Sequence, residues 1–175
     1  GTVLNSEAQA RDTLDRLREA GYGGIELCAF MIRPSGPAVR LITWAAGMPV
    51  GRGGKLDWPR LVREAGLRVP SLHMDLDSLE RDIPAAAAQA GRFGAGYIVI
   101  TGMYRFPYGD ERVVRELAGR LTRAGEGLAR EGVHLLYHNH NCELQWVNAS
   151  QRAYDLLLEE TDPAAVGFEF DSYWF

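Results

Sequence analysis

The run Tyr97-Ile98-Val99-Ile100-Thr101, the long segment 110–131 and the run 133–138 together indicate the fold class. The first run is short, apolar and β-branched, which is typical of a buried strand. Segment 110–131 repeats apolar residues at three- and four-residue steps, so it predicts an amphipathic helix. Gly132 ends that helix, and residues 133–138 predict a second strand. This order predicts two parallel strands joined by a crossover helix.

The same pattern recurs along the chain. Consecutive predicted strands begin 28 to 44 residues apart, close to the roughly 30 residues that a strand and its crossover helix require. Residues 31–55 interrupt the pattern, and we interpret them as a loop or lid insertion with one helical turn around 38–44. The whole chain, residues 1–175, is expected to form a single partial barrel domain. The other predicted helices are 7–20, 58–65, 83–93 and 150–160 (N-cap Ser150), and the other predicted strands are 24–28, 69–73, 166–171 and, as a further candidate, 2–4.

Composition narrows the class of protein. The 175 residues are 46% hydrophobic and 24% charged, close to the average for globular proteins. The net charge of −4 argues against nucleic acid as a partner, and no apolar run approaches the roughly 20 residues of a membrane span. Two cysteines, Cys28 and Cys142, are too few for a disulfide framework. We therefore expect a cytoplasmic protein with no membrane partner.

Polar side chains follow the predicted strands at their carboxyl ends, where parallel sheets bind ligands. Because side chains alternate along a strand, His138 and His140 share one face, and Asp171 points to the corresponding side of the last strand. Imidazole and carboxylate from neighbouring strands are ligands for Zn²⁺, Mn²⁺, Co²⁺ or Fe²⁺. The sequence therefore predicts that His138 and Asp171 bind a metal.

Several of these residues also have a purely structural interpretation. His73, alone at the end of strand 69–73, fits a core histidine bonded to a backbone carbonyl. Glu169 and His134 are expected one layer deeper, as a buried ion pair. His140 and Glu143 fit either a catalytic role or the capping of the loop that follows them.

Segments 21–27, 137–143 and 168–174 resemble the sugar phosphate isomerase/epimerase family, whose members are xylose isomerase-like TIM barrels. The resemblance covers nearly the whole chain. It implies an α/β fold of the (β/α)8 type, with a divalent metal (Mn²⁺, Zn²⁺, Co²⁺ or Mg²⁺) at the carboxyl-terminal mouth of the barrel. It also implies that Asp171 corresponds to the family's metal aspartate. His138 departs from the family, which has a glutamate here that binds metal and, in epimerases, acts as a base.

The resemblance also implies the remaining roles. Because the glutamate is missing, His140 and Glu143 become the candidates for acid–base catalysis. Glu26, His73 and Trp174 become candidates for substrate contact, and an aromatic ring such as Trp174 suits stacking on a sugar.

Length is the second departure from the family. A barrel of this type needs about 250 residues, so the resemblance predicts an incomplete barrel of about six strands that ends after the sixth strand. The family's later metal ligands have no counterpart in the sequence. Exposed strand edges favour pairing with another chain, and we therefore expect a homo-oligomer.

The expected function is a metal-dependent isomerase, epimerase or lyase that acts on a sugar, keto-sugar or inositol through an enediolate. Three alternatives stay open. They are a non-catalytic sugar-binding barrel, an inactive partial barrel, and an apurinic endonuclease-like repair enzyme, against which the acidic net charge argues.

Overall fold

The computed structural model describes residues 6–33, 41, 44–45, 55–103 and 105–175. They belong to two compact units. The first unit comprises Gly1–Leu72 with Arg92–Gly94, and the second comprises His73–Gly91 with Ala95–Phe175.

The described strands form a parallel sheet with helices between successive strands, as predicted. Their order in the sheet is their order in the chain. About six strands were expected and five are described; the candidate strand at residues 2–4 lies outside the described residues. The strands are β1 Leu27–Cys28, β2 Ser71–Met74, β3 Tyr97–Thr101, β4 His134–His138 and β5 Val166–Glu169.

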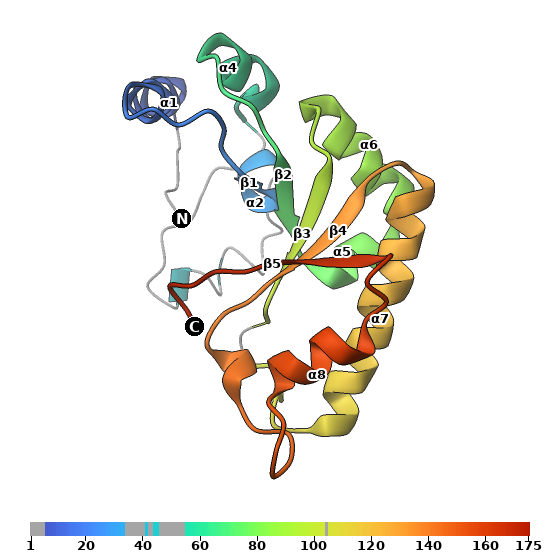
Figure 1. Cartoon of the computed structure of the whole chain (residues 1–175). Coiled ribbons are helices and arrows are strands. Elements are labelled where there is room, and N and C mark those ends of the chain that lie inside the picture. The colour runs from blue at the N-terminus through green and yellow to red at the C-terminus, as the bar shows by residue number, and fades with distance from the viewer. Residues whose placement is uncertain (1–5, 34–40, 42–43, 46–54, 104) are drawn as a thin grey trace. The chain divides into compact units, whose positions relative to one another are not determined.

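The helices agree with the predicted periodicity where the apolar pattern is long. Helix α7 has the strongest pattern, and it packs against the shorter α8 within the second unit (Figure 1). Two short helices and one turn of 3₁₀ helix were not predicted from the sequence. The helices are α1 Glu7–Glu19, α2 Ala29–Ile32, α4 Trp58–Glu64, α5 Leu76–Arg81, α6 Ile83–Phe93, α7 Glu111–Arg130, η1 Cys142–Leu144 and α8 Ala153–Glu160.

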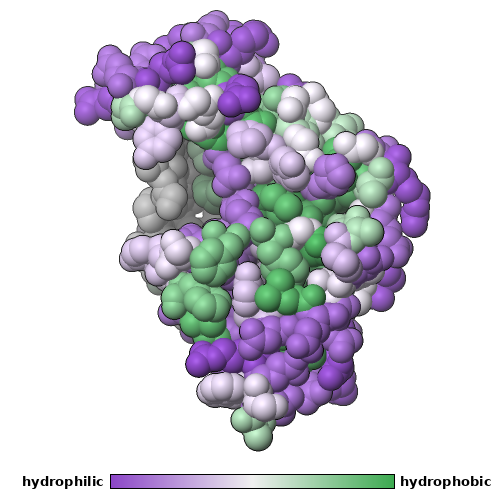
Figure 2. Space-filling view, in the orientation of Figure 1, coloured by the Kyte–Doolittle hydropathy of each residue, from purple (hydrophilic) through white to green (hydrophobic). Residues whose placement is uncertain are grey.

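In the first unit, α1 and α4 are held together by charged side chains. Arg11 Nη2 lies 2.6 Å from Glu64 Oε2, and Arg60 Nη2 lies 2.9 Å from Glu7 Oε2. These two helices present mostly hydrophilic side chains in the space-filling view (Figure 2). Their inner sides are apolar, and the core of the unit consists of Ala10, Leu14, Leu27, Trp58, Leu61, Val62, Leu67, Val69 and Leu72.

In the second unit, the register of three strands determines which side chains meet. Thr101 of β3 pairs with His138 of β4, and His138 pairs with Glu169 of β5. Residues 98–100 of β3 are almost completely buried, and helix α7, whose Leu117, Leu121 and Leu128 are also buried, packs against β4 and β5. The carboxyl ends of β3, β4 and β5 are therefore fixed side by side.

Several boundaries differ from the sequence predictions, among them strands 69–73 and 166–171, which are observed at 71–74 and 166–169, and two of the differences have local reasons. Helix α8 begins at Ala153 rather than near Ser150, because the Ser150 N–H donates to Asn148 Oδ1 at 3.1 Å. The side chain of Asp155, inside the helix, accepts from the backbone N–H of Arg152 at 3.3 Å instead. Strand β1 is only two residues long, since Gly24 forms an isolated bridge to Arg68.

Little of the predicted loop or lid at 31–55 belongs to the described residues. Met31 and Ile32 end helix α2, and the Met31 carbonyl accepts from Trp58 Nε1 at 3.0 Å. The predicted helical turn around 38–44 falls mainly outside the described residues. Within the described part of the chain, every helix is too short or too polar to cross a bilayer.

Candidate metal and substrate site

His138 lies between two carboxylates at the ends of β4 and β5. Its Nδ1 is 2.9 Å from Glu169 Oε1, and its Nε2 is 3.8 Å from Asp171 Oδ2. The imidazole is 14% exposed and the Asp171 side chain is 33% exposed, so both groups reach the surface. The structure thus brings together the two residues predicted to bind metal.

The hydrogen bond to Glu169 favours one tautomer of His138. A carboxylate oxygen accepts hydrogen bonds, so the 2.9 Å contact with Glu169 Oε1 fits the tautomer that has its N–H at Nδ1. Nε2 then presents either a lone pair or a second proton toward Asp171. A lone pair facing a carboxylate oxygen is repulsive unless a cation lies between them.

The donor set fits a divalent metal. Ligand atoms about 2.1 Å from a tetrahedral ion lie roughly 3.4 Å apart, so His138 Nε2 and Asp171 Oδ2, 3.8 Å apart, need to close by only a few tenths of an ångström. A carboxylate on the other nitrogen, as Glu169 provides here, is the usual way of orienting a histidine that binds metal. Glu169 is a residue whose positioning role the sequence analysis missed.

Glu169 and His134 do not form the predicted ion pair. Register places His134 opposite Tyr97, at the start of β4, where it is exposed and lies 5.9 Å from the Tyr97 ring. Glu169 pairs instead with His138, four residues further along the strand, which corresponds to roughly 13 Å. The prediction was wrong because alternation identifies the face of a strand but not its register with the next strand.

His73 joins this group from the end of β2. Its Nδ1 lies 3.2 Å from the Thr101 hydroxyl, and its Nε2 lies 3.9 Å from Glu169 Oε1. Its ring meets the His138 ring edge-on, with the centroids 5.8 Å apart. His73 is thus placed beside the candidate metal ligands, where it can contact a substrate or complete a metal shell.

Asp171 is held by an amide that the sequence analysis did not select. Asn139 Nδ2 donates to the Asp171 carbonyl at 3.1 Å, and the Asp171 N–H donates to Asn139 Oδ1 at 2.9 Å. Asn139 is 1% exposed, so this two-point contact is shielded from water. The sequence indicated Asn139 only through its position between His138 and His140, with its side chain on the opposite face of the strand.

His140 and Trp174 extend the site beyond the carboxylates. The His140 ring lies 5.2 Å from the His138 ring and 5.0 Å from the Trp174 ring, in edge contacts. Trp174 remains 37% exposed, so it offers an apolar surface beside the metal candidates. The acid–base role of His140 and the substrate contact of Trp174 stay predictions.

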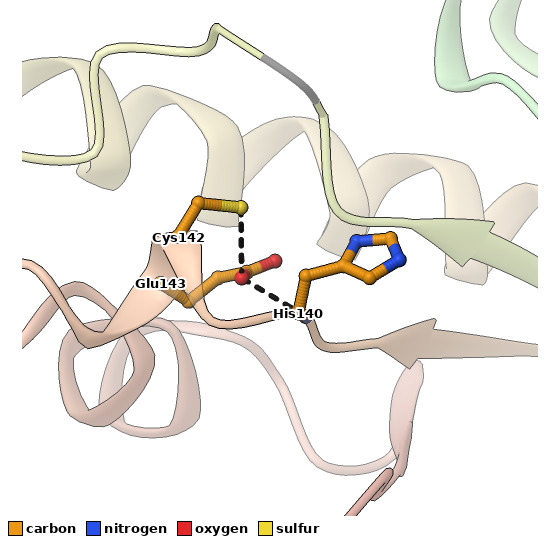
Figure 3. Close-up of side chains that lie close together, drawn as sticks. All are labelled: His140, Cys142 and Glu143. Atoms are coloured by element: carbon orange, nitrogen blue, oxygen red, sulfur yellow. Dashed lines mark hydrogen bonds between the residues drawn. The ribbon is translucent and has the colours of Figure 1, made fainter. Parts of the chain in front are cut away.

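Glu143 is fully buried and occupied by internal hydrogen bonds. Its carboxylate accepts from the His140 backbone N–H at 3.0 Å, from the Cys142 thiol at 3.2 Å and from the Tyr137 hydroxyl at 2.8 Å (Figure 3 shows the first two). The hydroxyls of Tyr137 and Tyr108 are 2.9 Å apart. The catalytic role of Glu143 stays a prediction, and these contacts favour its positioning of the loop that carries His140.

His140, Cys142 and Glu143 offer ligand atoms within 4.8 Å of one another, but their chemistry fits a metal poorly. Burial and the hydrogen bond to Glu143 raise the pKa of the Cys142 thiol to about 12. A thiol binds metal as its thiolate, which this environment disfavours. Burial also raises the pKa of the Tyr137 and Tyr108 hydroxyls, so the cluster is held as neutral donors around one carboxylate.

Glu26 belongs to the first unit, where it is largely exposed and accepts a hydrogen bond from the Ser71 hydroxyl. Its role in substrate contact stays a prediction. Cys28, two residues later, is partly buried, and desolvation raises the pKa of its thiol.

Comparison with known proteins gave matches among solved structures only. No model of a known protein family matches the sequence, and no curated protein matches it. A sugar phosphate isomerase/epimerase from Parabacteroides distasonis is 24% identical, with a TM-score of 0.71, over 94% of this chain and 60% of its own.

Two further structures contain metals. The IOLI protein with a bound zinc atom is 15% identical, with a TM-score of 0.58, over 98% of this chain and 60% of its own. A xylose isomerase-like TIM barrel protein from Mycobacterium smegmatis in complex with magnesium is 16% identical, with a TM-score of 0.51, over 93% of this chain and 56% of its own.

These likenesses extend over nearly all of this chain but only about three fifths of the neighbours' lengths. The parallel strands, the intervening helices and the strand order agree with the fold of those neighbours. The chain is therefore a partial barrel of the xylose isomerase-like TIM barrel fold, and its strong structural neighbours are sugar phosphate isomerase/epimerase and xylose isomerase-like proteins.

Proposed function

We propose that this chain belongs to a divalent-metal-dependent isomerase or epimerase that acts on a sugar, keto-sugar or inositol. The observation that carries the proposal is the position of His138, which Glu169 holds through Nδ1 while Nε2 faces Asp171. The isomerase/epimerase name of one structural neighbour and the zinc and magnesium of two others support the proposal.

The contacts of each site residue indicate its proposed role. His138 and Asp171 would hold the metal, and Glu169 fixes the orientation of the imidazole. When bound, a divalent metal polarises a substrate carbonyl and lowers the pKa of the adjacent C–H group. The other residues bind and orient the substrate, or move its proton.

His140 is the proposed acid–base residue, because its ring lies between His138 and the exposed Trp174. It takes the proton from the α-carbon, leaving an enediolate. In isomerisation it returns the proton to the neighbouring carbon while the hydroxyl proton passes to the former carbonyl oxygen, whereas epimerisation needs a second acid to deliver a proton from the opposite face. Trp174 packs against the apolar face of the sugar. Glu143 and Asn139 act as positioning residues, through the His140 backbone and the Asp171 backbone respectively.

The first test is metal content after reconstitution with Mn²⁺ or Zn²⁺, measured by elemental analysis. His138→Ala and Asp171→Ala should abolish stoichiometric binding, and Glu169→Gln should weaken it roughly 10- to 100-fold. His134→Ala is the matched control, because it removes an exposed histidine from the same strand. Full metal content in both His138→Ala and Asp171→Ala would contradict the proposed site.

The second test separates catalysis from simple binding. In D₂O, the metal-loaded protein should exchange the α-proton of a keto-sugar, followed by NMR across a panel of ketoses and ketoinositols. His140→Asn should keep its metal and lose this exchange. A protein that binds sugars and metal without any exchange would instead be the non-catalytic sugar-binding barrel.

A further inference from the structure

The first unit contains a cleft of about 740 Å³ that none of the proposed catalytic residues lines. Its walls come from the segments that precede β1 and β2, from α4, and from the end of α6 at residues 92–94. Three arginines line it: Arg63 on α4, Arg68 before β2 and Arg92 on α6. The lining residues that the structure describes include no aspartate or glutamate.

These three arginines differ from Arg60 in having no counter-charge among the described residues. Arg60, on the same helix as Arg63, lies 2.9 Å from Glu7 and 3.3 Å from Glu64. Within the described parts of the chain, the side chains of Arg63, Arg68 and Arg92 make neither an ion pair nor a hydrogen bond. All three arginines are exposed, and an anion bound in the cleft would be attracted by their positive charge.

The backbone holds Arg68 in the cleft. Its N–H donates to the Gly23 carbonyl at 3.1 Å, and its carbonyl accepts from the Ile25 N–H at 2.8 Å. Its guanidinium lies over Gly23, where an added Cβ would come 3.8 Å from Nη2. A Cβ on Gly24 would come 3.0 Å from the Arg68 carbonyl oxygen, a tight contact, so the close approach of these two segments favours glycine there.

The buried side of the cleft is apolar. Val62, Leu67 and Val69 line it and are each less than 10% exposed. Its volume lies within the roughly 300–1,000 Å³ of pockets for small molecules. Guanidinium groups match the oxygens of a phosphate in planar, two-pronged hydrogen bonds, and an apolar wall suits an uncharged organic body.

We propose that this cleft binds a small phosphorylated organic molecule, with the phosphate on Arg63, Arg68 and Arg92 and the organic part against Val62, Leu67 and Val69. Nucleic acid is disfavoured, because a polyanion needs an extended basic surface and the chain carries a net charge of −4. The site shares no residue with the proposed metal centre, so it stands independently of the proposed catalytic function.

The test is calorimetric titration at low ionic strength with three probes: pyrophosphate, AMP and adenosine. We expect measurable binding of pyrophosphate, tighter binding of AMP and much weaker binding of adenosine. Arg63→Gln, Arg68→Gln and Arg92→Gln should each weaken AMP binding by roughly tenfold. Arg112→Gln is the charge-matched control, since Arg112 is 80% exposed on α7 and pairs only weakly with Glu116, and it should leave AMP binding unchanged.

The melting temperatures of the unliganded variants show whether the three arginines stabilise the fold. Because no described carboxylate pairs with them, the three substitutions should leave the melting temperature unchanged or raise it. Absence of AMP and pyrophosphate binding at millimolar concentration would overturn the proposal. So would equal weakening by Arg112→Gln, or binding of single-stranded DNA that is tighter than binding of AMP and falls steeply with salt.

Discussion

Glu143 illustrates how much one buried charge demands of its surroundings. An ionised carboxylate inside a protein is costly unless donors replace its lost hydration. Here Tyr137, Cys142 and the backbone of His140 supply those donors. The carboxylate also lies so close to the end of β3 that Gly102 leaves no room for a side chain there. The chain thus stabilises Glu143 with both hydrogen bonds and close packing.

We predict that Gly102→Ala destabilises the protein by about 2–4 kcal/mol, because its Cβ would overlap Glu143 Oε1 and crowd the His140 ring. Urea denaturation measures the loss. The control is Gly96→Ala, directly before the same strand in the sequence. Its Cβ lies in open space, so the free energy of unfolding should change by less than about 0.5 kcal/mol. Equal stability of the two variants would show that Glu143 moves aside freely.

At the level of elements, two glycines of helix α7 differ in how closely neighbouring atoms approach them. Gly125 faces the turn before β5, and an added Cβ would overlap the Ala165 carbonyl. Gly119, on the same helix, would place a Cβ 3.3 Å from the flexible end of Arg123. The two glycines therefore have opposite roles, although both weaken the intrinsic helix propensity.

Two substitutions in α7 should consequently have opposite effects. Gly125→Ala should destabilise the protein by about 1–3 kcal/mol, since backbone on both sides must shift. Gly119→Ala should stabilise it by about 0.5–1 kcal/mol through helix propensity alone. Thermal unfolding followed by circular dichroism compares them, and destabilisation by both variants would refute this account of how α7 packs.

At the level of the whole molecule, alkaline pH tests the buried network. Burial raises the pKa of the Cys142 thiol from 9.0 to about 12, and it also raises that of the Tyr108 and Tyr137 hydroxyls. The unfolded chain therefore loses these protons first, and stability must fall as pH rises above about 9.

We expect the free energy of unfolding to be steady between pH 7 and 8.5 and to decline between pH 9 and 12. Urea titrations across this range, under reducing conditions, measure it. Cys142→Ser keeps a donor toward Glu143 without a thiol that titrates, so its decline should be shallower. An identical pH dependence in this variant would mean that Cys142 is not protected from ionisation.

Much of the architecture was predictable because it depends on local patterns. Helix α6 and strand β3 have the predicted bounds, 83–93 and 97–101, since glycines and a strong apolar pattern delimit them. Helix α5 escaped because its six residues are too few to show a period. The start of α8 was misplaced because Asp155, inside the helix, caps it rather than Ser150.

For the site, side-chain alternation correctly placed His138 and Asp171 toward a common space at the ends of parallel strands. It could not identify the partner of Glu169, because alternation repeats every two residues while register is set by hydrogen bonds between strands. In the folded protein, the register of the two adjacent strands places His138 opposite Glu169. Local composition therefore accounts for the elements and their faces, whereas the contacts that orient His138, Asp171 and His140 arise only when distant segments pack together.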